Sequence, residues 1–189
     1  INTSVGAHYT KGQGYYEEFQ ENQLLQNYNQ GTDTSNLVRQ LWLLNDIMGV
    51  VYTVNLSKDH FSLTFGGAAN TYLGNHFGKI IRADNGQNVN FNQRYYDSDA
   101  TKTEWTNYIK ASRNIQKGAS QYKFFGDLQF RAVSYKAQGT NDDQSAINFD
   151  NTFNFINPKV GMTVTKRSLS TSKTWDVFLG ATHREPART

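Results

Sequence analysis

The sequence predicts an all-β fold made of antiparallel transmembrane β-barrel strands with long extracellular loops. Three observations carry this prediction. Apolar and polar residues alternate along several segments, which is the period of a β-strand. Short polar turns and long polar stretches alternately connect these segments, as they do in barrels that span an outer membrane. No apolar run approaches the roughly 18 residues of a membrane-spanning helix.

The composition suits such a barrel and excludes several other classes of protein. The chain has 189 residues, the length of one domain, and 19% of them are charged whereas 14% are aromatic. Few charges and many rings argue against disorder. The chain has no cysteine for a disulfide or a thiolate metal site. Its basic residues are scattered, so we expect no nucleic acid as a partner.

Each predicted strand is defined by its apolar positions. The clearest alternation is in residues 122–134, where Leu128 and Phe130 are apolar and Gln129 and Arg131 are polar. In chain order, the predicted apolar faces are Val5, Ala7, Tyr9; Trp42, Leu44, Met48, Val50, Tyr52, Val54, Leu56; Phe61, Leu63, Phe65; Trp105, Ile109, Ala111; Tyr122, Phe124, Gly126, Leu128, Phe130, Ala132; Val160, Met162, Val164; and Trp175, Val177, Leu179, Ala181. Together they predict roughly six to eight strands.

The connections between these strands fall into two length classes. The predicted short turns are residues 55–60, 114–121 and 167–174. The predicted long loops are residues 10–36, 70–102 and 137–157. Loops of this length are unusual in a compact soluble domain. Residues 16–28 fit either a short helix within the first loop or an irregular loop.

No residue pattern indicates catalysis, a cofactor or a metal. The four histidines have no partner at the spacing of a metal site. The carboxylates of Asp142, Asp143 and Asp150 lack the regular spacing and the glycine of a calcium loop. No motif marks a catalytic nucleophile. We therefore expect a protein that is not an enzyme.

Aromatic residues near the predicted strand ends allow two interpretations. In a soluble β-sandwich they would be core, and in a barrel they would form girdles at the two membrane–water interfaces. The polar positions that alternate with them favour the girdles, because polar side chains can line a watery lumen. These residues are Trp42, Tyr52, Phe61, Trp105, Tyr122, Tyr135 and Trp175.

The first two long loops supply the candidate ligand-binding residues, because binding sites usually lie on loops held by a rigid scaffold. Paired rings can stack on a sugar or a chelate, and charged side chains and a histidine can add polar contacts. The candidates are Tyr15, Tyr16, Glu17, His76, Arg82, Arg94, Tyr95 and Tyr96. The alternative is that the loop rings, among them Phe149, pack against one another.

Several short motifs follow one another between Gly12 and Arg188. They are Gly12-Gln13-Gly14-Tyr15-Tyr16-Glu17; Trp42-Leu43-Leu44-Asn45-Asp46; Gly66-Gly67-Ala68-Ala69-Asn70-Thr71-Tyr72 followed by Gly74-Asn75-His76-Phe77-Gly78; Lys102-Thr103 before Trp105; Gly126-Asp127-Leu128-Gln129-Phe130-Arg131; Phe153-Asn154-Phe155-Ile156-Asn157-Pro158-Lys159; and His183-Arg184-Glu185-Pro186-Ala187-Arg188. This ordered set resembles the barrel of TonB-dependent receptors from Bacteroidetes-type bacteria.

The resemblance implies a nutrient importer in the bacterial outer membrane. The family has a 22-stranded barrel closed by an N-terminal plug domain. Residues 1–189 would be a segment of that one barrel domain, without the plug, and the TonB complex would act through regions outside this chain. The expected partners are outer-membrane lipid and a small-molecule or glycan ligand, such as an iron chelate or a cobalamin. The alternatives are a passive outer-membrane pore and a soluble β-sandwich carbohydrate-binding module.

Overall fold

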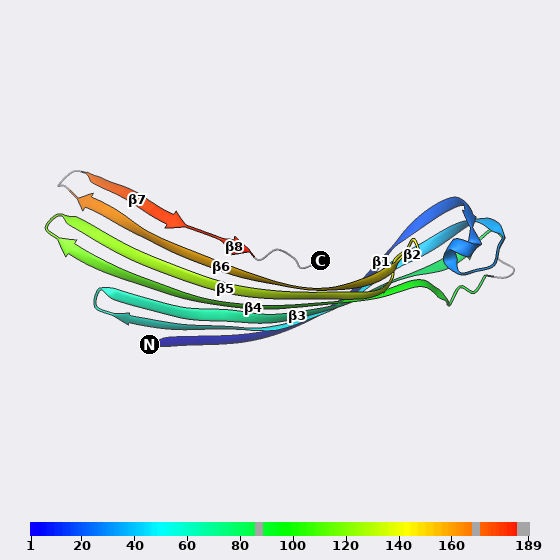
Figure 1. Ribbon diagram of the computed structural model, residues 1–189, viewed down its shortest axis with the longest axis horizontal. Helices are drawn as coiled ribbons and strands as arrows, with labels where there is room; N and C mark the ends of the chain where they lie inside the picture. Colours follow the sequence, from blue (N-terminus) through cyan, green and yellow to red (C-terminus); the bar gives the residue numbers. More distant parts are fainter. Residues whose placement is uncertain (86–88, 168–170, 185–189) are drawn as a thin grey trace.

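The computed structural model describes residues 1–85, 89–167 and 171–184, and these form one antiparallel β-sheet (Figure 1). Seven strands are hydrogen-bonded in sequence order, and a short eighth strand pairs with the sixth. The strands are β1 (Asn2–Leu24), β2 (Thr34–Lys58), β3 (Phe61–Ala83), β4 (Arg94–Lys117), β5 (Ser120–Thr140), β6 (Ala146–Arg167), β7 (Ser172–Gly180) and β8 (His183–Arg184). The prediction of an all-β antiparallel fold is therefore confirmed.

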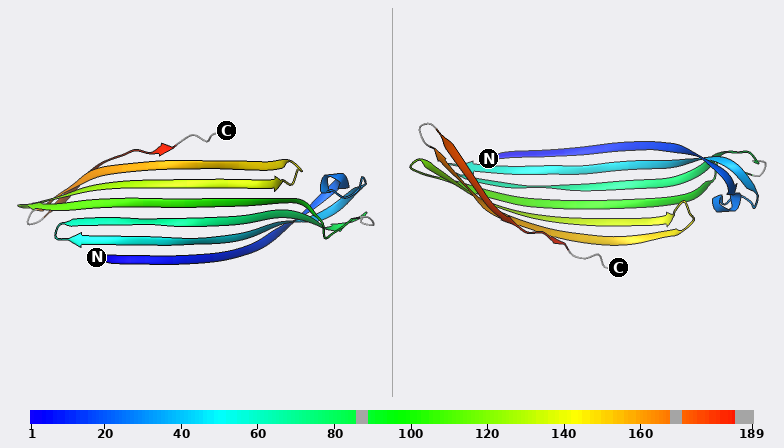
Figure 2. Two further views of the ribbon diagram at one scale, coloured as in Figure 1. Left: turned by 60° about the horizontal axis from the view of Figure 1, so that its bottom comes forward. Right: turned by 90° about the horizontal axis from the view of Figure 1, so that it is seen from above.

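The sheet is long, twisted and open (Figure 2). Strands β1 and β7 are at its two ends and do not pair with each other within the described residues. The turns β2–β3 and β4–β5 lie at one end of the sheet, beside the neighbouring ends of β6 and β7, and we call this the short-turn end (Figure 1). The other three connections lie at the opposite end, which we call the loop end. Among the described residues, no helix is long and apolar enough to cross a membrane.

The prediction of three long loops is wrong in extent. Most of residues 10–36, 70–102 and 137–157 belongs to strands. The strands end at Leu24, Ala83 and Thr140, and the next ones begin at Thr34, Arg94 and Ala146. Hydrophobic alternation fades in these segments, but their backbone hydrogen bonds continue into the neighbouring strands. Pairing of this kind depends on the partner strand, which a one-sequence pattern does not contain.

The possible helix in residues 16–28 is also largely absent. Residues up to Leu24 extend β1, and only Leu25–Tyr28 form a helical turn, the 3₁₀ helix η1. Asn29 ends this turn in the left-handed conformation, with φ of 56°. Asparagine tolerates that conformation better than most residues do.

The strand register places all the predicted apolar positions on one face of the sheet. Residues directly opposite each other in an antiparallel pair share a face. One such row runs from Val50 through Ala69 and Trp105 to Ala132. The seven predicted apolar sets lie on the same side as this row, except Ala181, which follows β7. We call this side the apolar face.

The opposite side, which we call the polar face, carries mainly hydroxyl, amide and charged side chains. They include Thr53, Asn55, Ser62, Thr64, Asn70, Thr106, Lys110, Lys123, Asp127, Gln129, Arg131, Thr163, Thr165 and Asp176. Nothing in the described chain covers the apolar face, where Trp105 is 51% exposed and Val160 58%. The hydrophobic core is instead a small cluster at the loop end, around Leu37, Ile80 and Tyr95.

Tyrosines cross two adjacent glycines of β3 on opposite faces. On the apolar face, the hydroxyl of Tyr52 passes over Gly67 and donates a hydrogen bond to Oδ1 of Asn107. On the polar face, the ring of Tyr108 lies over Gly66, and its hydroxyl is 3.4 Å from that of Thr53. A Cβ atom at either glycine would overlap the crossing tyrosine. The two glycines therefore let polar groups of β2 and β4 meet across β3.

Six of the seven predicted girdle rings lie on the apolar face. Phe61, Tyr122 and Trp175 are within the first four residues of β3, β5 and β7, close to the short turns. Tyr135 lies on the polar face, so its assignment to a girdle is wrong. Alternate residues of a strand face the same side, and Tyr135 is four residues from Arg131 but seven from Leu128. It therefore shares the face of Arg131.

Candidate functional site

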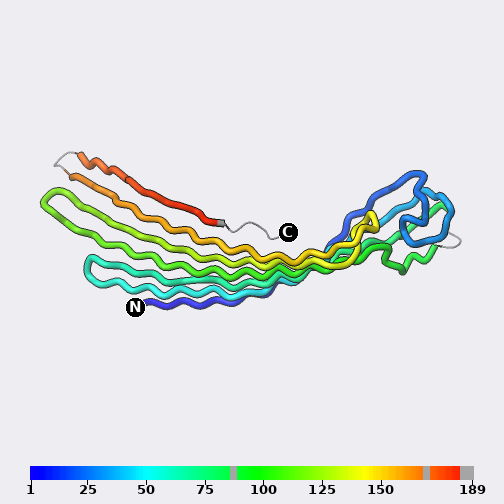
Figure 3. The backbone as a smooth tube through the Cα atoms, in the orientation of Figure 1, coloured from blue at the N-terminus to red at the C-terminus, as the bar shows by residue number. Residues whose placement is uncertain are grey.

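Side-chain amides tie together the three connections at the loop end, whose backbone Figure 3 traces. Nδ2 of Asn29 donates to the carbonyl of Tyr95 at 3.0 Å and to Oε1 of Gln144 at 3.0 Å. Nε2 of Gln144 donates to the same carbonyl at 2.8 Å. The buried Gln30 exchanges hydrogen bonds with the backbone of Asn90. These bonds fix the edge of the polar face, where a ligand arriving from the loop end would first meet the sheet.

A groove of about 520 Å³ lies on the polar face beside these connections. Its lining combines rings, aliphatic side chains, a histidine and two carboxylates. The lining residues are Tyr16, Leu41, His76, Tyr96, Ser98, Asp99, Ala100, Tyr135, Ala137, Asn141, Asp142, Ile147 and Phe149. A volume of this size is typical of small-molecule sites, roughly 300–1,000 Å³.

Register explains how distant residues meet in this groove. Tyr16 of β1 and Tyr96 of β4 lie on one row across the sheet, with Leu41 and Gly78 between them. His76 lies on the neighbouring row, opposite Ser98. Three of the eight candidate residues therefore line one groove, although they come from segments far apart in the sequence. Stacking rings beside hydroxyl and amide groups are a common way to hold a sugar or another flat polar ligand.

A β-bulge turns two consecutive tyrosines toward the same face. Gly78 pairs with Tyr96 and Lys79 pairs with Arg94, which leaves Tyr95 as the extra residue of β4. Both rings then pack over Gly78, with their centroids 5.1 Å apart. A bulge re-aims side chains in this way because it breaks the strict alternation of a strand.

Burial and nearby charge affect the phenols at this site. Burial raises the pKa of Tyr96 to about 12, and the negative charge of Asp142 adds to the effect. Burial also raises the pKa of Tyr95 far above its usual value. Both phenols therefore keep their protons near neutral pH. Tyr95 accepts a hydrogen bond from Nη1 of Arg39 at 3.3 Å, and that guanidinium pairs with Glu18 at 2.7 Å.

The remaining candidates do not reach the groove. Tyr15 follows the other parity of β1 and packs on Trp42 at the apolar side, with ring centroids 4.5 Å apart. Glu17 is on that side too, where it accepts a hydrogen bond from Gln40 at 2.8 Å. Tyr95 is 2% exposed, so its role is in the core.

Two arginine candidates are also engaged elsewhere. Arg82 is exposed and pairs with Asp84 at 3.6 Å. The guanidinium carbon of Arg94 lies 3.6 Å from the ring centroid of Phe77, and its Nη1 pairs with Asp97 at 2.6 Å. Arg94 therefore extends an aromatic row that begins at Tyr15.

Sequence reasoning missed several groove residues or gave them other roles. Tyr135 and Phe149 form an edge-to-face pair in the groove, with centroids 5.3 Å apart. Asp142 was considered only as part of an acidic cluster. Tyr135 is four residues after Arg131 in the same strand, so the alternation could have placed it on the polar face. The position of Asp142 depends instead on where the β5–β6 turn ends.

No grouping of three or more histidine, aspartate or glutamate side chains suited to a metal ion occurs in the part of the chain that the structure describes. No family model, no curated protein and no solved structure matches this chain. Function is therefore argued from the two faces of the sheet and from the groove.

Proposed function

We propose that this chain forms part of the wall of a β-barrel in a bacterial outer membrane, and that the barrel is a TonB-dependent importer of a scarce nutrient. The observation that carries the proposal is the coincidence of all seven apolar strand faces on one side of a single sheet. In this proposal the apolar face contacts lipid, the polar face lines the lumen, and further strands join β1 and β7 to close the barrel.

The strand lengths favour a barrel over a soluble sandwich. Strands β1 to β6 are 21 to 25 residues long. Strands in globular proteins are usually about 3–10 residues long. At about 3.4 Å per residue, a strand of this kind extends roughly 70–80 Å. Such a strand can cross a membrane and continue well beyond it. A soluble sandwich is built from much shorter strands.

The height of the apolar band also fits a membrane. Along β5 the band runs from Tyr122 to Ala132, a distance of about 34 Å at 3.4 Å per residue. A strand tilt of about 45° reduces this to about 25 Å along the membrane normal, the height of the apolar band of outer-membrane barrels.

Four charged residues at the same level form two ion pairs on the polar face. Arg131 contacts Glu104 at 2.8 Å, and Lys110 contacts Asp127 at 3.7 Å. Their strand neighbours on the other face are residues such as Trp105 and Leu128. Charges at membrane depth are tolerated where they are paired or face a watery interior.

The importer part of the proposal is supported by the ordered motifs and by the groove. The motif glycines Gly66, Gly67 and Gly78 are each crossed by tyrosine rings, so their place in the motifs has a steric reason. The groove combines rings with polar groups at the loop end, where a nutrient would arrive. Its ligand class is an iron chelate, a cobalamin or a glycan.

Single cysteine labels test the membrane part directly, because the chain has no cysteine of its own. Nitroxides placed one at a time at Leu128, Gln129, Phe130 and Arg131 of the full-length protein in lipid vesicles would be compared for access to oxygen and to a water-soluble nickel chelate. We expect 128 and 130 to favour oxygen and 129 and 131 to favour nickel. Equal access at all four positions would refute the lipid-facing assignment.

The importer is tested by uptake in cells. Labelled iron chelates, cobalamins and glycans would be offered to cells with and without the gene, and with and without a working TonB complex. Uptake that needs both supports an importer. Uptake that needs the gene but not the TonB complex supports a passive pore instead.

A further inference from the structure

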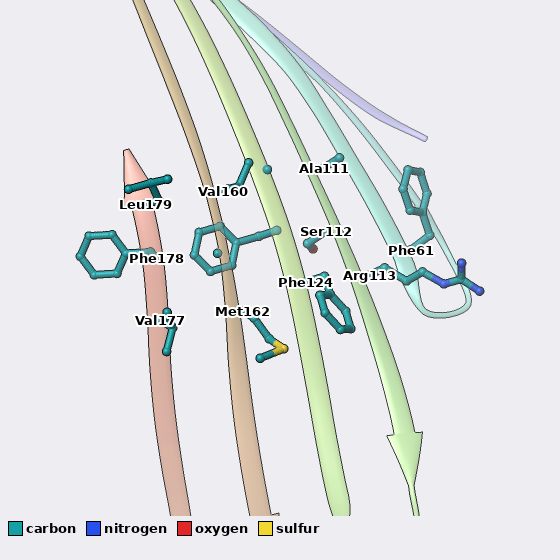
Figure 4. Close-up of a pocket in the computed structure, with 13 residues that line it drawn as sticks. Phe61, Ala111, Ser112, Arg113, Phe124, Val160, Met162, Val177, Phe178 and Leu179 are labelled. Atoms are coloured by element: carbon teal, nitrogen blue, oxygen red, sulfur yellow. The ribbon is translucent and has the colours of Figure 1, made fainter. Parts of the chain in front are cut away.

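A hollow lies on the apolar face, near the short-turn end (Figure 4). It has a volume of about 800 Å³. Its floor is the row Ala111–Gly126–Val160, where two small residues lie side by side. Phe61 and Phe124 border the hollow on one side and Leu179 on the other. We call this hollow the trough.

A row of cations lies next to the trough on the same side of the sheet. Arg113 lines the trough directly and shares a row with Phe61 and Phe124. Nearer the turns, Lys117, Lys166 and Lys173 also have apolar-face parity, and Lys58 pairs opposite Phe61. All five side chains are exposed. We call Lys58, Arg113, Lys117, Lys166 and Lys173 the basic rim.

Ion pairs with the described carboxylates do not neutralise the charges of the basic rim. None of its five cations forms an ion pair with a carboxylate of the described residues. Elsewhere in the described chain, seven ion pairs are present, including Lys110–Asp127 on the polar face beside the trough. Unpaired cations beside an apolar hollow are complementary to a molecule with an anionic head and a hydrocarbon tail.

We propose that the trough and the basic rim form a binding site for an anionic phospholipid. The phosphate lies on the basic rim, with Arg113 as its innermost contact, and an acyl chain lies in the trough over Gly126. The site rests on the proposed function, because it requires the apolar face to contact lipid. The short-turn end then faces the periplasm, so the lipid belongs to the inner leaflet of the outer membrane.

The order of residues along the strands matches the order of groups in a phospholipid. From the turn inward, β4 presents Lys117, Ile115, Arg113 and Ala111 to the apolar face. In this order the charge of Lys117 comes first, nearest the turn. The charge of Arg113 follows, within reach of the membrane interface, and the small residue Ala111, which opens the trough, comes last. An arginine near the end of a membrane strand can extend its guanidinium toward the headgroups while its stem lies against apolar surface.

The test uses the full-length protein purified in detergent and titrated with phosphatidylglycerol or with zwitterionic phosphatidylcholine, with bound lipid counted by native mass spectrometry. We expect tighter binding of phosphatidylglycerol. Arg113→Gln combined with Lys117→Gln should weaken its binding roughly tenfold or more and leave phosphatidylcholine little changed. Lys123→Gln, which removes a charge from the polar face of β5, is the matched control and should have no effect.

A second variant tests the trough without changing charge. A Cβ atom at Gly126 would meet only the carbonyl of Lys159, at 4.0 Å, so Gly126→Leu should fold and fill the floor. We expect it to weaken the binding of both lipids severalfold. Ala132→Leu places the same side chain on the same face of β5 outside the trough, and should leave binding unchanged.

Two results would overturn the proposal: equal affinity for the two lipids in the unmodified protein, or unchanged affinity in Gly126→Leu. The nitroxide labels at Leu128 and Gln129 separate this failure from that of the proposed function. If position 128 lies in lipid and phosphatidylglycerol is not preferred, only the specific site is wrong. If position 128 does not lie in lipid, the outer-membrane assignment itself fails.

Discussion

Gly67 is the position where one added methyl group should disturb the apolar face most. A Cβ atom there would lie 2.5 Å from the carbonyl oxygen of Thr106 and 2.6 Å from the hydroxyl of Tyr52. The first neighbour is backbone and cannot rotate away, so β3 and β4 must separate locally. The second must move, which ends its hydrogen bond to Asn107.

The cost of Gly67→Ala has two parts. Leaving the amide oxygen of Asn107 unpaired on a face that the proposed function places against lipid costs about 1–3 kcal/mol. Strain from overpacking adds about 1–3 kcal/mol. We therefore expect the free energy of unfolding to fall by roughly 2–5 kcal/mol. At Gly126 the nearest atom to an added Cβ is 4.0 Å away, so Gly126→Ala should be neutral or stabilise by up to about 1 kcal/mol.

The assay is urea unfolding of the full-length protein in lipid vesicles, followed by tryptophan fluorescence. Tyr52→Phe and the double variant Tyr52→Phe/Gly67→Ala complete a cycle. Both single changes remove the same hydrogen bond, so their effects should sum to about 1–3 kcal/mol more than the effect of the double variant, which is the cost of losing that bond once. Equal destabilisation by Gly67→Ala and Gly126→Ala would refute the reasoning, because it would make the crossing tyrosine irrelevant.

Three further outcomes follow from the structure. Tyr16→Ala should weaken ligand affinity severalfold, as measured by isothermal titration with the ligand found in uptake assays. Tyr15→Ala, on the opposite face, should leave the affinity unchanged, and the reverse pattern would place the binding site on the apolar face. Protease added to intact cells should cut at Arg82 before Lys58, as read from fragment masses, and the opposite order would invert the orientation. Tyr96 has a pKa raised to about 12, so its contribution to stability is complete below pH 10 and is lost as pH rises toward 12. Tyr96→Phe should reduce this alkaline loss of stability in thermal unfolding scans. An unchanged loss would contradict the assignment of the effect to Tyr96.

The sequence gives good information about individual strands and little about their extent. Leu128 and Gln129 were assigned to opposite faces correctly, because successive residues of any strand point to opposite sides. Segments such as residues 10–24 lack a regular apolar pattern, so they were taken for loop. They remain strand because β2 supplies their backbone partners, and a single segment does not show what lies beside it.

The groove illustrates the same division. Tyr16, His76 and Tyr96 were chosen for their chemistry, and the structure brings them together through the register of four strands. Tyr15 was chosen for the same chemistry and faces the other way. Tyr95 faces the same side as Tyr96 because of a bulge, whose position depends on how β3 and β4 pair, but its ring is buried in the core.

The sequence by itself determined that the chain is all-β and which residues share a face within each strand. Both follow from local chemistry, since alternation is a property of the strand alone. Only the tertiary structure decided that the seven apolar faces coincide and that small residues align to open the trough. Those features depend on register between strands, and a shift of one residue would turn a whole strand over.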